Sequence, residues 1–257
     1  MKALTKAVNL SILRGIISVV LFVALWQLVV VLKVPYLEYL PFPKEVALDG
    51  AHAAVTKVYW FNWGISLQRI FIGFIAAQLI GIPVGMAMGM SRVFRDFTFP
   101  LFEILRPIPP IAWIPIGILY WPTRELSIYF LVFIGAFFII VINVLRGVSN
   151  ISVTLTRAAS SLGARPGDIF WKIMVPGSLP SIVTGMTVGM GVTWNVLIAA
   201  EMIAGQGGLG RMTWEAYTNH NIPFIVVGMI SIGVAGYLCS TLIRWLGDLA
   251  MPWNKKF

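Results

Sequence analysis

The chain has 257 residues, of which 58% are hydrophobic and 11% are charged, and its mean hydropathy is +0.87. Soluble domains carry about 25% charged residues, so this composition excludes a soluble protein of this size and indicates that a bilayer is the solvent. The net charge of +9 comes mostly from basic residues at the ends of apolar runs rather than in one patch, which argues against nucleic acid as a partner. The single cysteine, Cys239, excludes an intramolecular disulfide.

Six apolar segments approach the roughly 20 residues that a membrane-spanning helix needs. The first of them follows a basic N-terminus, but its length and the absence of an A-x-A-like site after it favour a membrane helix over a cleaved signal peptide. The predicted spans cover residues 13–33, 64–90, 99–121, 126–146, 180–203 and 222–246. The sequence therefore predicts an all-α membrane protein with about six transmembrane helices.

The third predicted span is irregular because it contains four prolines, Pro107, Pro109, Pro110 and Pro115. Proline removes a backbone donor and bends a helix. In a membrane such a break survives only where protein or water satisfies the freed carbonyls, so we expect this segment to lie inside the bundle.

Glycines at a spacing of four residues predict close packing between helices. Gly81, Gly85 and Gly89 follow this spacing, as do Gly185 and Gly189. Small residues four apart let two helix backbones approach in lipid, although glycine is also common in membrane helices without such a role.

The distribution of lysine and arginine predicts that both termini are cytoplasmic. With the N-terminus in the cytoplasm, twelve basic residues fall on that side and six on the other, and Arg106 lies within the third span. The cytoplasmic set is Lys2, Lys6, Arg14, Arg92, Arg95, Arg146, Arg157, Arg165, Lys172, Arg244, Lys255 and Lys256, and the outer set is Lys33, Lys44, Lys57, Arg69, Arg124 and Arg211.

A cytoplasmic insert, residues 147–179, separates the fourth and fifth spans and is too long for a simple turn. Its first half predicts a short helix, because Ser152 can act as N-cap and Ala158 and Ala159 give it a small apolar face. Gly163 suits the left-handed residue that ends a helix. Such a helix fits a groove on a partner; a helix lying on the membrane surface is the alternative.

A second short helix is predicted directly after this glycine. Pro166 and Asp168 suit its first turn, and Pro176 and Pro180 are expected to end it before the fifth span.

The insert resembles the cytoplasmic signature of ABC importer permeases, which reads E-A-A, three residues, G, nine residues, I-x-L-P. Here Arg157-Ala158-Ala159, Gly163, Ile173 and Val175-Pro176 stand at matching positions. Arg157 replaces the usual glutamate, which affects any ion pair that the glutamate makes with its partner, and Val175 replaces a leucine of similar volume.

Four further stretches are similar to permeases of the nitrate, sulfonate, taurine and bicarbonate subgroup. They are SLQRIFIGFIAAQLIGIPVGMAMGMS (66–91), RPIPPIAWIPIGILYW (106–121), AAEMIAGQGGLGRMTWEA (199–216) and the closing MPWNKK (251–256). The resemblance begins near residue 63. It predicts an N-terminal helix with an outer linker, residues 1–62, and a permease domain, residues 63–257.

The resemblance implies a type I ABC importer permease fold with short cytoplasmic coupling helices, set in the bacterial cytoplasmic membrane. It implies a homodimer or a pseudo-dimer with a second permease, two ATPase subunits that bind ATP and Mg, and a substrate-binding protein or domain outside. This chain would need no cofactor of its own, and its sequence has no G-x-x-x-x-G-K-[ST] phosphate loop. The implied coupling residues are Arg157, Ala158, Ala159, Gly163, Asp168, Ile173 and Pro176.

Two other classes of function are weighed against this one. An enzyme lacks its parts, because His52 and His220 are the only histidines and neither has metal-ligand spacing. The G-x-G-x-x-G match at residues 205–210 follows no strand, so it does not indicate dinucleotide binding. The alternative to an importer is an ATP-independent channel or secondary transporter, which has no use for the cytoplasmic signature.

Ionisable and polar residues inside the spans are candidates for the translocation pathway, because they are costly in a membrane. The candidates are Arg69, Glu103, Arg106, Trp194, Asn195 and Glu201. Glu103 and Arg106 are three residues apart and can also form a structural ion pair, and Arg69 can instead snorkel to the interface. The cargo of the subgroup is mostly small anions, which Arg69 and Arg106 would attract.

Overall fold

The computed structural model describes residues 2–253, with side chains from residue 13 onward. Over this range the chain forms helices and connecting segments and no strand. It divides into two compact units, Met1–Trp60 with Thr213–Ile230, and Phe61–Met212 with Ser231–Phe257. The end of the MPWNKK stretch (254–256) and the side chains of Lys2, Lys6, Lys255 and Lys256 from the topology count lie outside the described residues.

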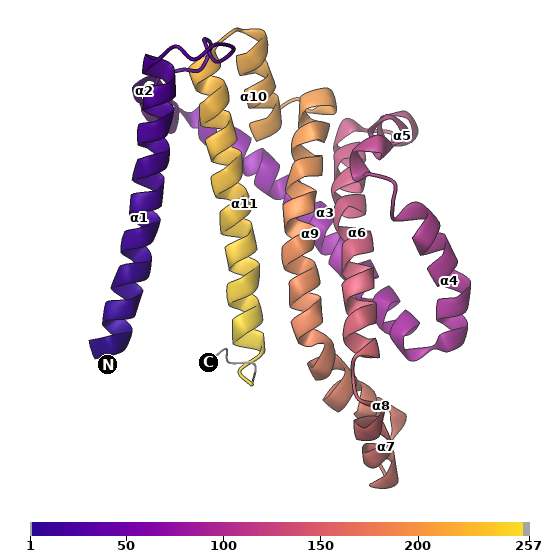
Figure 1. Cartoon of the computed structure of the whole chain (residues 1–257). Coiled ribbons are helices and arrows are strands. Elements are labelled where there is room, and N and C mark those ends of the chain that lie inside the picture. The colour runs from indigo at the N-terminus through magenta and orange to yellow at the C-terminus, as the bar shows by residue number, and fades with distance from the viewer. Residues whose placement is uncertain (1, 254–257) are drawn as a thin grey trace. The chain divides into compact units, whose positions relative to one another are not determined.

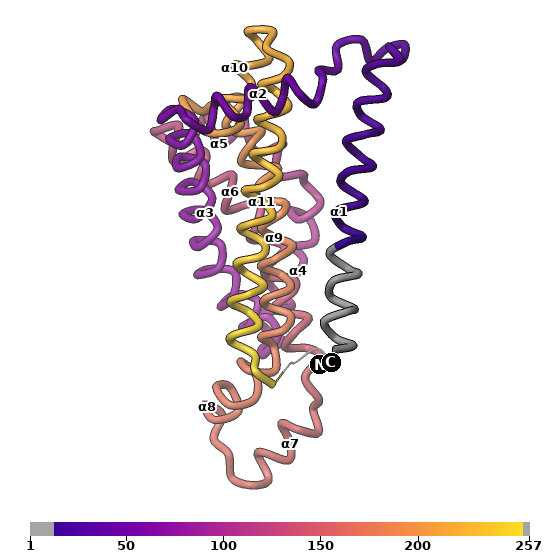
Figure 2. The backbone as a smooth tube through the Cα atoms, turned by 90° about the vertical axis from the view of Figure 1, so that its left-hand side faces the viewer, coloured from indigo at the N-terminus to yellow at the C-terminus, as the bar shows by residue number. Residues whose placement is uncertain are grey.

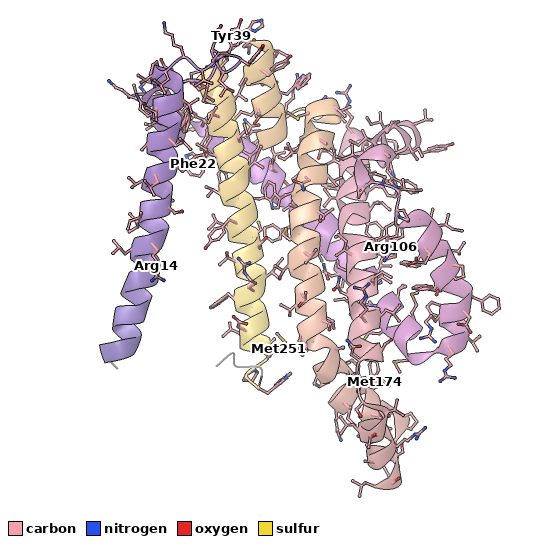
Figure 3. All side chains as sticks on the ribbon, in the orientation of Figure 1. Arg14, Phe22, Tyr39, Arg106, Met174 and Met251 are labelled. Atoms are coloured by element: carbon pink, nitrogen blue, oxygen red, sulfur yellow. The ribbon has the colours of Figure 1, made fainter. Side chains whose placement is uncertain are left out.

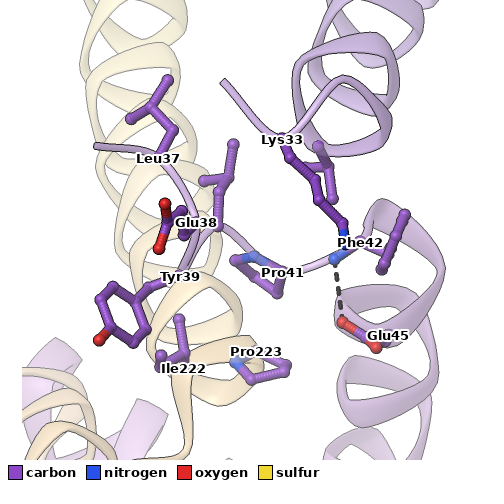
Figure 4. Close-up of a pocket in the computed structure, with 11 residues that line it drawn as sticks. Lys33, Leu37, Glu38, Tyr39, Pro41, Phe42, Glu45, Ile222 and Pro223 are labelled. Atoms are coloured by element: carbon purple, nitrogen blue, oxygen red, sulfur yellow. Dashed lines mark hydrogen bonds between the residues drawn. The ribbon is translucent and has the colours of Figure 1, made fainter. Parts of the chain in front are cut away.

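The first unit contains α1 (Lys2–Val31) and α2 (Pro43–Ala54). Trp26 Nε1 donates a 3.0 Å hydrogen bond to the carbonyl of Pro41. The Glu45 carboxylate accepts one of 2.9 Å from the Phe42 amide, which Figure 4 shows. The outer linker predicted within residues 1–62 therefore contains a helix. Its start is fixed by a proline in the first turn and a carboxylate that bonds back to the preceding amide.

The second unit is built around α3 (Lys57–Met90), α6 (Arg124–Ser149) and α9 (Val175–Ala204), and α6 and α9 run side by side (Figure 1). The glycines of α3 lie directly against α6. A Cβ at Gly85 would stand 2.7 Å from Cβ of Val144, and one at Gly89 would stand 2.6 Å from Cβ of Val148. Gly185 of α9 meets Asn143 at 2.7 Å in the same way. The close helix packing predicted from glycine spacing is confirmed.

The third span is broken, as its prolines predict. α4 (Arg92–Leu105) is followed by a 3-10 turn (Pro110–Trp113) and α5 (Ile114–Tyr120), and the two parts meet at an angle of 89°. With this bent pair counted as one span, the described residues hold up to six spans, in agreement with the predicted number. Ile114 and Gly117 of α5 are buried, but α4 has no buried residue, so the interior position expected for the whole segment is wrong for α4 within the single chain.

The last two helices are α10 (Leu209–Thr218) and α11 (Ile222–Ala250). The segment between the predicted spans 180–203 and 222–246 is thus mostly helical, and residues 205–208 alone connect α9 to α10. In the second unit, Gly236 and Gly247 of α11 lie against Trp194 and Val183 of α9.

Between α6 and α9 the chain forms α7 (Val153–Ser161) and α8 (Pro166–Ile169), which project beyond the ends of α6 and α9 (Figures 1 and 2). A π-helical turn, Phe170–Met174, joins α8 to α9 without a break. The prediction that Pro176 and Pro180 end the second short helix is wrong. Pro176 lies directly after the π turn, which is closed by the Val175 amide on the Phe170 carbonyl, and the helix continues through both prolines as α9.

Candidate functional site

The part of the insert that holds the implied coupling residues, 152–176, is called the coupling segment, and it begins with a short helix whose limits agree with the sequence. Ser152 stands at the N-cap of α7, although its hydroxyl makes no cap hydrogen bond. Ala158 is exposed and Ala159 is half-buried. Leu162 at the tip is 88% exposed, so the projection carries apolar surface that nothing in the single chain covers.

Gly163 has a φ of +87° and ends this helix in the left-handed conformation that the sequence predicts. The Gly163 amide donates to the Ser160 carbonyl and the Ala164 amide to the Ala159 carbonyl, each at 3.0 Å. These bonds satisfy carbonyls that the end of a helix leaves open. The reversal therefore depends on a backbone angle that glycine adopts without strain.

The second half of the segment connects this reversal to the membrane helix. Asp168 accepts a 3.3 Å hydrogen bond from the Arg165 amide and a 2.7 Å bond from Lys172 Nζ. Ile173 lies in the π turn, which runs through Met174 into α9 (Figure 3). Arg157, where the resemblance has glutamate, is exposed on α7.

At the opposite ends of α6 and α9, buried charges gather around the segment that follows α9. Arg69 of α3 donates from Nη1 to the Glu201 carboxylate at 3.0 Å, and from Nη2 to Glu125 of α6 at 2.5 Å. Its Nη1 also donates to the carbonyl of Gly207 at 2.6 Å. Arg69 is 3% exposed and Glu201 is fully buried, whereas Glu125 is 47% exposed.

The Glu201 carboxylate has further partners, which make the cluster a support for the glycine segment. Ser66 Oγ donates to it at 2.8 Å and accepts from the Leu209 amide at 2.8 Å. The Gly210 amide donates to Glu201 Oε2 at 2.9 Å, and the Gly208 amide donates to Asn62 Oδ1 at 2.7 Å. We call Ser66, Arg69, Glu125, Glu201 and residues 205–210 the glycine-loop cluster; its hydrogen bonds compensate the burial of its charges.

Sequence reasoning named Arg69 and Glu201 separately and missed Ser66 and Glu125. The structure brings the four together, and in this arrangement the Arg69 guanidinium is engaged by two carboxylates and a carbonyl. No local spacing signals the pairing, since Arg69 and Glu201 stand 132 residues apart.

Glu103 and Arg106 lie elsewhere, at the end of α4. Figure 3 labels Arg106. The side chains of Glu103 and Arg106 form an ion pair of 3.3 Å and are each about two-fifths exposed. They line a cavity of about 740 Å³ between α4 and the C-terminal part of α6. The two remaining candidates point to different faces of α9, because Trp194 is buried against Gly236 and Asn195 is exposed.

Two other features of the described residues bear on ligands. A second cavity, of about 650 Å³, lies in the first unit between residues 30–45 and the start of α11 (Figure 4). No group of three or more His, Cys, Asp or Glu side chains in the described part of the chain could hold a metal ion.

The broken third span and the projecting helices between α6 and α9 define a polytopic membrane protein with the type I ABC importer permease fold. An inward-facing structure of the MetNI methionine ABC transporter shares this fold, with a TM-score of 0.61 over 77% of this chain and 97% of that chain at 22% identity. The chain belongs to the family of binding-protein-dependent transport system inner membrane components, whose family model matches residues 59–256.

Curated relatives place the chain in the nitrate, taurine and sulfonate subgroup of these permeases. The taurine transport system permease protein TauC of Escherichia coli is 34% identical over 98% of this chain and 92% of its own length. The nitrate import permease protein NrtB of Synechocystis is 30% identical over 96% and 92%. A putative ABC transporter permease protein of Methanocaldococcus jannaschii, MJ0413, is 39% identical over 76% and 73%.

Proposed function

We propose that this chain is the membrane-spanning subunit of an ATP-driven importer and that it couples ATP hydrolysis to the uptake of a small anion. In this proposal two copies, or this chain and a second permease, form one pathway across the bacterial cytoplasmic membrane. Two separate ATPase subunits bind ATP and Mg, and a substrate-binding protein or domain delivers the cargo from outside. Both termini, and the α7–α8 end of the second unit, face the cytoplasm.

The observation that carries the proposal is the continuous path from α7 through Gly163 and the π turn into α9. The projection exposes Leu162 and Ala158 at its end, and a helix with small side chains can approach a partner groove closely. Because α8, the π turn and α9 run without a break, a displacement of α8 would be transmitted directly to a membrane helix. A channel that opens without ATP has no need of such a lever.

The proposed cargo is a small oxyanion or sulfonate, such as nitrate, bicarbonate or taurine. The transport of taurine by TauC and the import of nitrate by NrtB support this class of cargo. In this chain the candidate pathway residues are Arg69, Glu103, Arg106, Trp194, Asn195 and Glu201. Arg106 and Asn195 are the exposed members besides Glu103, and we assign them to the pathway surface. Arg69 and Glu201 would act on it indirectly, by holding the glycine segment.

The test is reconstitution of the chain with its ATPase and binding protein in proteoliposomes, followed by uptake of radiolabelled taurine and of nitrate. We expect uptake into the vesicles that requires ATP in the vesicle lumen, which corresponds to the cytoplasm. This uptake should be lost when the ATPase is omitted. Uptake that continues at the same rate without the ATPase would instead identify a channel or a secondary transporter. ATP hydrolysis by the purified chain alone would also contradict the proposal.

A further inference from the structure

The cavity between α4 and α6 has a charge pattern that the ion pair of Glu103 and Arg106 does not explain. Its lining contains three arginines, Arg95, Arg106 and Arg146, and two carboxylates, Asp96 and Glu103. Arg106 is paired with Glu103. Among the described residues, no ion pair or hydrogen bond engages the side chains of Arg95 and Arg146, so the cavity has two guanidiniums available to a ligand.

The geometry of α4 directs these groups into the cavity. Arg95, Phe99, Glu103 and Arg106 recur every three or four residues and therefore share one face of the helix. The opposite face is apolar and exposed, with Val93 at 67%, Phe97 at 78%, Leu101 at 60% and Ile104 at 69%. α4 thus separates an apolar outer surface from a charged inner one.

The other wall is the C-terminal part of α6. It contributes the apolar side chains of Ile142 and Leu145 and then Arg146, Ser149 and Asn150. Ser149 and Asn150 stand directly before the projection that starts at Ser152, so the cavity lies where α6 passes into the proposed coupling segment.

We propose that this cavity binds an oxyanion, with Arg95 and Arg146 as the contacting groups. A guanidinium offers a planar set of donors that fits the oxygens of nitrate, sulfonate or phosphate. The guanidiniums of Arg95 and Arg146 form no ion pair with a carboxylate here. A cavity of about 740 Å³ is within the range of small-molecule sites and admits a hydrated anion. Apolar walls from Ile142 and Leu145 lower the local dielectric and strengthen the attraction.

The two guanidiniums would bind the same oxyanion group from either of two sources. One is the transported anion on its way to the cytoplasm, an assignment that rests on the proposed function. The other is the phosphate of an anionic lipid. The site itself depends on neither assignment, and the experiment distinguishes them.

The single cysteine makes the site measurable by thiol labelling. In a Cys239→Ser background, Ser149→Cys places one thiol in the wall of the cavity. Its reaction rates with a sulfonate-bearing and a trimethylammonium-bearing methanethiosulfonate are compared in phosphatidylcholine vesicles. We expect Arg95→Gln and Arg146→Gln each to lower the ratio of the sulfonate rate to the trimethylammonium rate by about thirtyfold, because one unit charge about 4 Å away in water changes the two rates by about fivefold in opposite directions.

Two controls separate charge from folding. Arg92→Gln changes an exposed arginine of α4 that does not line the cavity, and it should leave the ratio unchanged. The double variant Arg95→Lys/Arg146→Lys keeps both charges and should retain most of the ratio. Equal ratios in the parent and in the Arg95→Gln/Arg146→Gln double variant would overturn the proposal.

Protection then identifies the occupant. Slower labelling with sodium nitrate than with sodium chloride of equal ionic strength, lost in the double glutamine variant, shows that the transported class of anion binds. Slower labelling after phosphatidylglycerol is added to the vesicles, again lost in that variant, shows a lipid phosphate. If none of these additions slows the labelling, the proposal is overturned. Because no ATPase or uptake is involved, the result stands apart from the test of the importer function.

Discussion

The guanidinium of Arg69 and the carboxylate of Glu201 form a 3.0 Å ion pair in which both side chains are almost fully buried, although they belong to α3 and α9. Glu201 is the last charged residue of α9 before the glycine segment, and it also accepts from the amide of Gly210. One carboxylate therefore neutralises a buried cation and fixes the entry into α10. The pair stabilises a particular path of the chain between two helices.

Replacing Glu201 with glutamine should destabilise the second unit strongly. The change leaves the buried charge of Arg69 with Glu125 alone, and removing one partner of a buried pair costs about 3–5 kcal/mol. We expect a lower thermal unfolding temperature in detergent and new proteolytic cleavage between residues 205 and 208, because the support of that segment is lost. Glu125→Gln is the matched control, since Glu125 is 47% exposed and water can replace it. Equal effects of the two changes would show that burial does not set the strength of this cluster.

Gly85→Ala should destabilise the chain through contact with α6. The added Cβ would stand 2.7 Å from Cβ of Val144 and 2.8 Å from the carbonyl of Val141, so two helices must separate. Overpacking of this kind costs about 1–3 kcal/mol. Gly64→Ala in the same helix is the control, because its Cβ would meet nothing within 4 Å. Unfolding temperatures of the two variants measure the difference, and a Gly85→Ala protein as stable as Gly64→Ala would refute the close packing.

The spans and the reversal at Gly163 could be predicted from sequence because they depend on local signals. Long apolar runs mark helices in lipid, prolines mark the break after α4, and glycine marks a positive φ. The helix limits differ by several residues where the chain leaves the apolar run, as at α4, which begins at Arg92 because Ser91 caps it. Hydrophobicity does not record such caps.

The partners of charged residues could not be predicted, because they are set by tertiary contact. Arg69 finds Glu125 and Glu201 across 56 and 132 residues of sequence. The continuation of α8 into α9 was missed for a different reason. Two prolines indicate a break, but the helix continues through both of them after a π turn, which no local pattern signals.

Gly163→Val should impair the coupling segment without preventing membrane insertion. Valine at a φ of +87° is strained by about 1–2 kcal/mol, and the reversal between α7 and α8 depends on this angle. Ala159→Trp should act at the same step by enlarging the face that, in the proposed complex, would contact the ATPase. Gly163→Asn is the control, because asparagine tolerates the left-handed region. Co-purification of the ATPase with each variant, together with substrate uptake, is the measurement. A normal complex and normal uptake for both Gly163→Val and Ala159→Trp would place the coupling element elsewhere.

The exchange Glu103→Arg/Arg106→Glu separates the two roles open to Arg106. If the ion pair is only structural, the exchanged residues still form it and uptake equals that of the parent chain. If Arg106 attracts the anion, the exchange places a carboxylate at residue 106 and uptake stays low. An exposed pair contributes about 0–1 kcal/mol to stability, so a large loss of uptake cannot come from unfolding.

We expect Arg106→Gln and the exchange each to lower nitrate or taurine uptake about tenfold, a change of about 1.4 kcal/mol in the barrier. Glu103→Gln, which frees the arginine, should keep uptake near the parent rate. Recovery of uptake in the exchanged variant would assign Arg106 to structure and remove it from the pathway.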